Sequence, residues 1–281
     1  APSSSPTPFV PPWAGSKRSP PMARNSVDLK KAQVLVCNDD GINAPGLKLL
    51  EKVLTSLARE VWVAAPETEQ SAVSHSLTLR RPLRIRKLSA RHFALDGTPT
   101  DCVLMGINEI MKSTPPDLVV SGVNRGGNLG EDVTYSGTVA AAMEGTLLGV
   151  PSVALSQVYA DGHPVKWATA EKWTAKVLKK LTAESWPPGV LINVNFPDVT
   201  AGRGTGIEVT RQGRRKIGSE LVRGTDPRGE SYYWIGAQRR EEKYSPGIDL
   251  EAISRGAISI TPLTMDLTHG PTCKKLKARF K

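Results

Sequence analysis

The chain alternates short apolar runs with stretches of helical periodicity from about residue 31 to residue 196, and this alternation constrains the fold more than any other feature. The apolar runs predict strands at 34–37, 61–65, 117–121, 151–156 and 189–196. Apolar residues spaced three and four apart predict helices between them, at 43–57, 98–111, 136–148 and 166–181. Strands joined by crossover helices pair in parallel. We therefore expect an α/β fold with a Rossmann-like, mostly parallel sheet flanked by helices.

Local signals add detail to this pattern. Asn43 is expected to cap the first helix, with Pro45 in its first turn. The segment 76–88, SLTLRRPLRIRKL, alternates apolar and polar residues and predicts a hairpin-like excursion. Residues from about 205 to 255 are rich in Gly and Arg and lack a helical period, so they predict an extended β arm. A last strand is expected at 256–263, followed by a basic C-terminal tail at 268–281.

Residues 1–29 differ from the rest of the chain in composition. They are rich in Pro and Ser and show no periodicity, so we expect a disordered leader that cannot bury enough apolar surface to fold. No apolar run approaches the roughly 20 residues that span a bilayer, and no secretory signal is evident. The three cysteines, Cys37, Cys102 and Cys273, are isolated and suit a reducing compartment. We expect a soluble cytoplasmic protein without a membrane partner, and organelle targeting by the leader stays open.

The net charge of +10 is unevenly distributed. From Arg203 to Lys281 there are 16 Lys and Arg residues against 9 Asp and Glu. This excess of basic residues has two interpretations. The basic residues form solvated faces, or they attract an anionic substrate toward a site.

The tetrapeptide NDDG places Asp39 and Asp40 at the end of the first predicted strand, and SGVNRGGNLG follows the strand at 117–121. The carboxyl ends of parallel strands meet at one rim of a sheet, where ligands bind. Two adjacent carboxylates repel one another unless a cation lies between them or one is protonated. With no His or Cys ligand nearby, an oxygen-only site favours Mg²⁺ or Mn²⁺. The alternative is a plain turn, in which Asp39 caps and Asp40 supports the bend.

Two further segments are suited to phosphate. The glycine-rich NRGGNLG can aim backbone N–H groups at an anion, and Asn128 lies within it. Ser136, Gly137 and Thr138 open a helix of small residues, and a helix N-terminus attracts anions. An ordinary turn and ordinary capping by Ser136 would explain the same residues.

The motifs together resemble the SurE survival-protein family of metal-dependent nucleotidases. The resemblance runs from about residue 31 to residue 267, which makes 30–267 a SurE-like α/β nucleotidase domain that includes the arm. It is carried by VCNDDGINAPG, APETEQSAVSHSLT, DGTPTDCV, DLVVSGVNRGGNLGEDVTYSGTVAAAMEG, DPRGESYYW and ISITPL. Two departures flank the motifs: Cys37 stands where the family often has Thr, and Thr100 where it often has Ala.

The resemblance implies a ligand set, an activity and an assembly. One divalent ion per subunit, Mg²⁺ or Mn²⁺, is expected on Asp39, Asp40, Ser71 and Asn124. The expected substrates are nucleoside 5′- and 3′-monophosphates, hydrolysed to nucleoside and phosphate, and short polyphosphate stays open as a further substrate. The arm at about 205–255 is expected to exchange between subunits of a homodimer or homotetramer.

The mechanism that we expect is attack by metal-activated water, with Asp39 or Asp40 as catalytic residues that also orient the water. The phosphate would be held by Asn128, Ser136, Gly137 and Thr138. A covalent aspartyl-phosphate is the rival mechanism.

Other classes of protein are less consistent with the residues. A dinucleotide-dependent oxidoreductase needs G-x-G-x-x-G after its first strand, where this chain has NDDG. A haloacid-dehalogenase-type phosphatase needs D-x-D-G-T, which is missing. A basic RNA- or polyanion-binding protein would use the C-terminal arm with the aromatic run 232–234 as a stacking surface, although we do not expect a nucleic-acid partner. His75, near Ser71, either donates to phosphate or makes a structural hydrogen bond.

Overall fold

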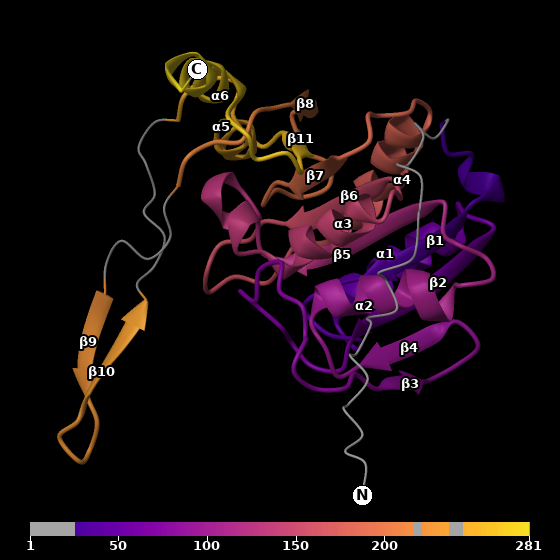
Figure 1. Cartoon of the computed structure of the whole chain (residues 1–281), viewed down its shortest axis with the longest axis horizontal. Coiled ribbons are helices and arrows are strands. Elements are labelled where there is room, and N and C mark those ends of the chain that lie inside the picture. The colour runs from indigo at the N-terminus through magenta and orange to yellow at the C-terminus, as the bar shows by residue number, and fades with distance from the viewer. Residues whose placement is uncertain (1–25, 216–220, 236–243, 281) are drawn as a thin grey trace, which may run out of the picture.

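The computed structural model describes residues 26–215, 221–235 and 244–280. Its centre is a nine-stranded sheet in the order β3-β4-β2-β1-β5-β6-β7-β11-β8 (Figure 1). Every pairing in this sheet is parallel except β3 with β4 and β7 with β11. The strands are β1 (Gln33–Cys37), β2 (Glu60–Pro66), β3 (Ile85–Lys87), β4 (His92–Leu95), β5 (Leu118–Arg125), β6 (Ser152–Gln157), β7 (Val190–Phe196), β8 (Ile207–Val209) and β11 (Ile258–Thr264). The predicted mostly parallel α/β sheet is confirmed.

Four helices cover the two faces of the sheet and bury alternate residues of each strand. Val34 and Val36 of β1 pack in one apolar cluster with α1 (Pro45–Thr55) and α4 (Trp167–Thr182). Leu35 and Cys37 point the other way, into a cluster with α2 (Pro99–Met105) and α3 (Gly137–Leu147). Burial on both faces is why the strand sequences are continuous apolar runs.

The starts of two helices differ in how they are capped. Pro45 opens α1 as predicted, but the N-cap is Ala44 without a side-chain hydrogen bond, so the prediction that Asn43 caps this helix is wrong. Thr98 and Asp101 form a reciprocal capping box at the start of α2. The chain then widens into a π-type turn, η2 (Gly106–Ile110), which completes the predicted helix 98–111.

The order of the strands creates the crevice in which the candidate site lies. From β1 the chain moves outward through β2 to β4, and then returns to place β5 on the opposite side of β1. Such a reversal is a topological switch point, and ligands of open α/β sheets bind there, beyond the carboxyl ends of the strands. The excursion predicted at 76–88 ends in β3, which pairs antiparallel with β4.

The region beyond β7 is only partly an arm. β9 (Leu221–Thr225) and β10 (Ser231–Ile235) form an antiparallel hairpin that lies apart from the main sheet (Figure 1). Within the same range of about 205–255, however, β8 joins the main sheet and α5 (Asp249–Ser254) packs against β11. The expectation of a range without helices is therefore wrong at α5, since a helix of six residues is too short to show a period. A helix, α6 (Gly270–Arg279), lies in the predicted tail.

The structure describes the chain from residue 26 onward at its N-terminal end. Residues 1–25 of the predicted leader lie outside the described residues. The end of the predicted leader is ordered against the body of the protein: Leu29 is buried in a short 3₁₀ turn, η1 (Leu29–Lys31), and the Val27 backbone N–H donates to the Thr182 carbonyl at 3.0 Å. In the part of the chain that the structure describes, no helix has both the length and the apolar character required to cross a bilayer.

Candidate active site

The candidate site lies where β1 and β5 end side by side. Asp39 and Asp40 follow β1, and Asn124 is the penultimate residue of β5. The register of β5 against β6 shifts between Ser121 and Asn124, and such irregularities re-aim side chains near active sites. Because β1 and β5 are parallel neighbours, NDDG and the end of β5 lie at the same rim of the sheet, as predicted.

Asp39 is buried against the first turn of α3. Its side chain accepts a hydrogen bond of 2.5 Å from the Thr138 hydroxyl, and its residue exposure is 5%. Burial, and after it the neighbouring charge of Asp40, raises the pKa of Asp39 to about 6 from 3.8, against the lowering effect of Thr138. Gly137 allows this close approach, since a Cβ there would lie 2.7 Å from the Asp39 Cβ. Burial therefore makes the ionised form of Asp39 less stable than that of an ordinary carboxylate, and a nearby cation would stabilise it.

Asp40 is half-buried and borders an open cavity of about 650 Å³. The Arg125 backbone N–H donates to it at 3.0 Å. Burial raises the pKa of Asp40, and the Glu69 carboxylate adds to the rise. Ser71, a predicted ligand, lines the same cavity and donates its hydroxyl to Glu69 at 2.7 Å. The segment that carries both residues is held beside the rim by the Gln70 amide, which donates to the Asp39 carbonyl at 2.7 Å.

Asn124 presents one atom suited to a cation. Its amide nitrogen donates to the Gly126 carbonyl at 3.0 Å, so the carbonyl Oδ1 is the atom left for a metal. Asn124 is half-buried and is not among the residues that line the cavity beside Asp40.

The donor set fits a hard divalent cation. Two carboxylates with raised pKa values, a hydroxyl and an amide oxygen are ligands that Mg²⁺ or Mn²⁺ takes, and a cation would relieve the repulsion between the carboxylates. Over residues 26–215, 221–235 and 244–280, no group of three or more His, Cys, Asp or Glu is arranged to hold a metal. Ser71 and Asn124 remain the candidates for the neutral oxygen ligands of such a site.

The predicted phosphate-binding residues at the start of α3 already have partners within the chain. The Ser136 hydroxyl caps the helix by accepting from the Val139 amide at 3.0 Å. The Thr138 hydroxyl is directed at Asp39, as described above. Both residues are buried. The backbone N–H of Thr138 also bonds the Asp39 carboxylate, and that of Val139 bonds Ser136, so Gly137 is the residue of this turn left to offer a backbone N–H to a phosphate.

Asn128 is held in a buried network of amides. Its amide nitrogen donates to the Ser156 hydroxyl at 2.7 Å, and its backbone N–H donates to the Asn195 side chain at 2.8 Å. The Asn128 carbonyl accepts from Asn193 at 2.9 Å. These contacts fix the glycine-rich loop to β6 and β7, and Asn128 is buried and does not line the cavity beside Asp40.

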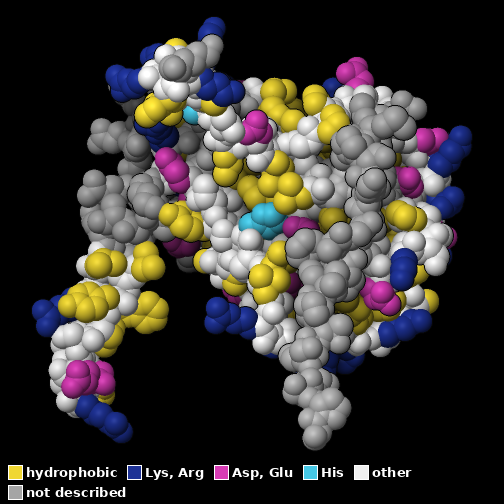
Figure 2. Space-filling view, in the orientation of Figure 1, with side chains coloured by type: hydrophobic (Ala, Val, Ile, Leu, Met, Phe, Trp, Pro, Cys, Tyr) yellow, Lys and Arg dark blue, Asp and Glu magenta, His cyan; other side chains and the backbone are white. Residues whose placement is uncertain are grey.

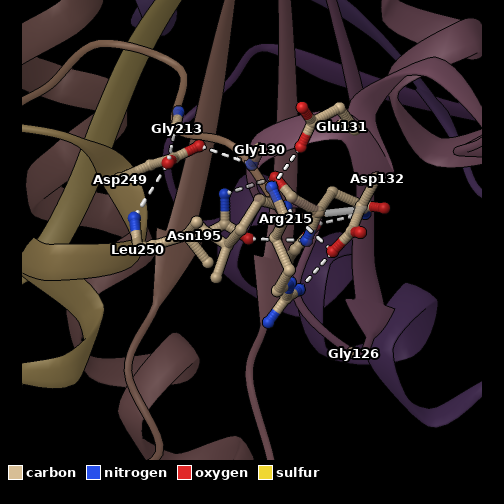
Figure 3. Close-up of polar contacts among 12 residues, drawn as sticks. Gly126, Gly130, Glu131, Asp132, Asn195, Gly213, Arg215, Asp249 and Leu250 are labelled. Carbon is tan, nitrogen blue, oxygen red and sulfur yellow. Dashed lines mark hydrogen bonds and ion pairs between the residues drawn. The ribbon is translucent and has the colours of Figure 1, made fainter. Parts of the chain in front are cut away.

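A second cluster braces the far side of this loop, and the sequence alone did not indicate it. Figure 3 shows Asp249 facing three backbone amides, those of Gly130 at 2.9 Å and of Gly213 and Leu250 at 2.8 Å. Arg215 contacts Asp132, which lies in the 3₁₀ turn η3 (Gly130–Thr134) just before α3. Burial raises the pKa of Asp249 against the lowering effect of the amides. The cluster joins α5 and the segment before the hairpin to the loop that leads into the site.

His75 has a structural partner. Its Nε2 lies 2.9 Å from the Glu144 carboxylate on α3, which ties the segment after Ser71 to that helix. The contact favours the structural interpretation of His75 over donation to phosphate.

Residues that sequence reasoning missed lie around the cavity. Glu69 stands two positions before Ser71 in the quoted motif APETEQS, so its position was a signal. Arg125 follows Asn124 directly. Tyr159, in the connection from β6 to α4, had no sequence signal, because nothing in its neighbours marks a site.

The geometry is that of a doubly wound α/β protein with an oxygen-rich site at its switch point, and comparison with known proteins agrees. The family model "Survival protein SurE" matches residues 34–219. A protein of Paramagnetospirillum magneticum named 5′-nucleotidase SurE is 61% identical over 261 residues, covering 93% of this chain and 99% of that protein. One of the same name from Parvibaculum lavamentivorans is 58% identical over 252 residues, covering 88% and 90%.

The fold is also similar to a solved structure. The crystal structure of the SurE protein from Aquifex aeolicus superimposes with a TM-score of 0.79 at 40% sequence identity, and covers 89% of this chain and 100% of that one. The chain belongs to the SurE family.

Proposed function

We propose that this chain is a phosphoric monoester hydrolase that releases phosphate from nucleoside 5′-monophosphates with the aid of one divalent cation per subunit. The observation that carries the proposal is the pair Asp39 and Asp40, with raised pKa values, at the switch point beside the N-terminus of α3. Membership of the SurE family and the name 5′-nucleotidase borne by its relatives support the same reaction.

The two carboxylates are suited to different tasks. A divalent cation held by Asp39, Asp40, Ser71 and Asn124 would supply Lewis acidity at the phosphoryl group. Asp39 is fixed by Thr138 and nearly closed to solvent, which suits holding a charge. Asp40 borders the cavity and is the better placed of the two to orient an attacking water. The closed position of Asp39 also disfavours the covalent mechanism at that residue, since a nucleophilic oxygen must reach phosphorus.

The phosphate itself would be oriented by the chain around this pair. The backbone N–H of Gly137 and the second amide hydrogen of Asn128 are the proposed donors for its oxygens. The cluster around Asp249 and Arg215 holds the loop in place before substrate arrives, so little ordering accompanies binding.

We further propose a wider range of substrates, a compartment and an assembly for this protein. Nucleoside 3′-monophosphates are substrates, and short polyphosphate is a candidate. The protein acts in the cytoplasm, in keeping with its free cysteines. It forms a homodimer or homotetramer through the hairpin β9–β10, on which hydrophobic side chains gather (Figure 2). The exposed residues of that hairpin are Leu221, Val222, Tyr232, Tyr233, Trp234 and Ile235.

A phosphate-release panel tests the proposal. The purified full chain is assayed on 5′- and 3′-mononucleotides and on polyphosphate, with Mg²⁺, Mn²⁺ or a chelator. We expect release that requires a metal and that falls by about a hundredfold or more in Asp39→Asn, because a preorganised charge is lost. Asp266→Asn, an exposed carboxylate outside the site, is the control. Metal-independent release by Asp39→Asn would overturn the proposal.

A further inference from the structure

The cavity beside Asp40 is lined by both charged and aromatic side chains. Its lining includes Asp40 and Ser71 of the proposed metal site together with Glu69. The lining also includes the aromatic side chains of Tyr159 and Trp167. Its volume of about 650 Å³ is that of a site for a small ligand, which typically occupies roughly 300–1,000 Å³. A ligand in this space can therefore meet both carboxylates and aromatic rings.

Arg125 contacts both an acidic and an aromatic residue of this lining. Its backbone N–H donates to Asp40 at 3.0 Å, and its guanidinium lies 5.2 Å from the centre of the Tyr159 ring. A guanidinium over an aromatic ring is held by cation–π attraction and presents a flat outer surface. Arg125 is exposed and Tyr159 is half-buried, so this flat surface is accessible from the cavity.

We propose that Tyr159 and Arg125 form the subsite that stacks the base of a nucleoside monophosphate whose phosphate lies at Asp39 and Asp40. This inference rests on the proposed function and adds the part of the chain that recognises the nucleoside. Nucleobases have flat π faces and stack on tyrosine rings and on guanidinium planes. Stacking of this kind tolerates every base, so the site selects for the presence of a base more than for its identity.

Two substrates that differ in the base test the subsite. Adenosine 5′-monophosphate and ribose 5-phosphate share the sugar and the phosphate, so the ratio of their kcat/KM values reports the base alone. The ratio is measured for the wild-type full chain with Mg²⁺ or Mn²⁺, and for Tyr159→Ala, Tyr159→Phe and Arg125→Gln. Arg91→Gln is the matched control, because Arg91 also lies over an aromatic ring, Trp62, at 5.8 Å, away from the site.

We expect the ratio to fall about tenfold in Tyr159→Ala, through a higher KM for adenosine 5′-monophosphate, because base stacking is lost. Tyr159→Phe keeps the ring and should keep the ratio, as should Arg91→Gln, whereas Arg125→Gln should lower it. Thermal unfolding of each variant shows whether the fold is retained. If Tyr159→Ala does not fold, Tyr159→Phe and Arg125→Gln still test whether the stacking surface sets the ratio.

Several results would overturn the subsite while the proposed function stands. One is a wild-type enzyme that hydrolyses both substrates with equal efficiency. Another is a Tyr159→Ala enzyme with an unchanged ratio, or with equal losses on both substrates, which would give Tyr159 a structural task. A loss in Arg125→Gln that is equal for both substrates would assign Arg125 to the phosphate. If the wild type releases phosphate from neither substrate, the proposed function itself fails.

Discussion

Replacement of Gly137 by alanine tests whether the contact between α3 and Asp39 is essential to the site. An ideal Cβ at this position would lie 2.7 Å from the Asp39 Cβ and 3.0 Å from its Oδ2. Carbon atoms in contact normally lie about 3.5–4.0 Å apart, so Asp39 or the first turn of α3 must move by roughly 1 Å. A displacement of about 1 Å in a catalytic group costs on the order of a hundredfold in rate. We therefore expect kcat/KM for adenosine 5′-monophosphate to fall about a hundredfold, or ~2.7 kcal/mol.

The free energy of unfolding should change much less than the activity. Overpacking costs about 1–3 kcal/mol, while alanine is favoured over glycine in a helix by about 1 kcal/mol. Phosphate release over a range of Mg²⁺ and Mn²⁺ concentrations, together with urea unfolding, separates the two effects. Gly202→Ala is the matched control, because nothing lies within 4 Å of a Cβ at that glycine. A Gly137→Ala enzyme with wild-type kcat/KM and metal dependence would refute the reasoning.

Three further predictions concern charge, the brace and assembly. In the presence of a chelator, Asp39 loses its proton near pH 3.8 in the unfolded chain but only near pH 6 in the folded protein. The free energy of unfolding should therefore fall as the pH rises through this window, by up to about 3 kcal/mol. Asp39→Asn should then be more stable than the wild type at pH 8 by urea unfolding, and excess Mg²⁺ should remove this advantage; equal stability under chelation would contradict it. Arg215→Met leaves the buried Asp132 carboxylate without its guanidinium and should lower the free energy of unfolding by about 3 kcal/mol, and a loss in urea titrations close to zero would show that the contact contributes little. Replacing 221–235 by a Gly-Ser linker should yield smaller assemblies in sedimentation, and an unchanged mass would rule out the hairpin as the interface.

The features that sequence reasoning predicted well have a short-range or periodic cause. The run from Val34 to Cys37 is apolar at every position because the strand is covered on both faces. The meeting of NDDG with the end of β5 at one rim followed from the position of Asp39 and Asp40 directly after that run, because the carboxyl ends of parallel strands meet. Both inferences need only neighbouring residues and one rule of sheet geometry.

The features that were missed depend on contacts between distant residues or on short elements. Asp249 binds amides of Gly130 and Gly213, and no spacing in the sequence marks these positions as partners. β4 has four residues and α5 has six, which are too few for a period to emerge. The cation–π contact of Arg125 with Tyr159 likewise joins the end of β5 to a loop after β6.

The cap of α1 was missed for a different reason. Asn43 is a good capping residue by type, but the helix begins one residue later, after Ala44, with Pro45 in its first turn. Proline at the first helical position lacks an N–H and has a suitable φ, so the helix can begin without a side-chain cap.

The position of β11 between β7 and β8 affects the order in which the sheet can fold while the chain is being synthesised. In the part of the chain that the structure describes, β8 pairs with β11 alone, and β11 ends at Thr264. Asp249, which holds the glycine-rich loop, is also synthesised late. On the ribosome, β1 to β7 can therefore assemble first, while β8 waits for its neighbour. The rim of the sheet would therefore be complete, and held by Asp249, only after β11 has emerged from the ribosomal exit tunnel.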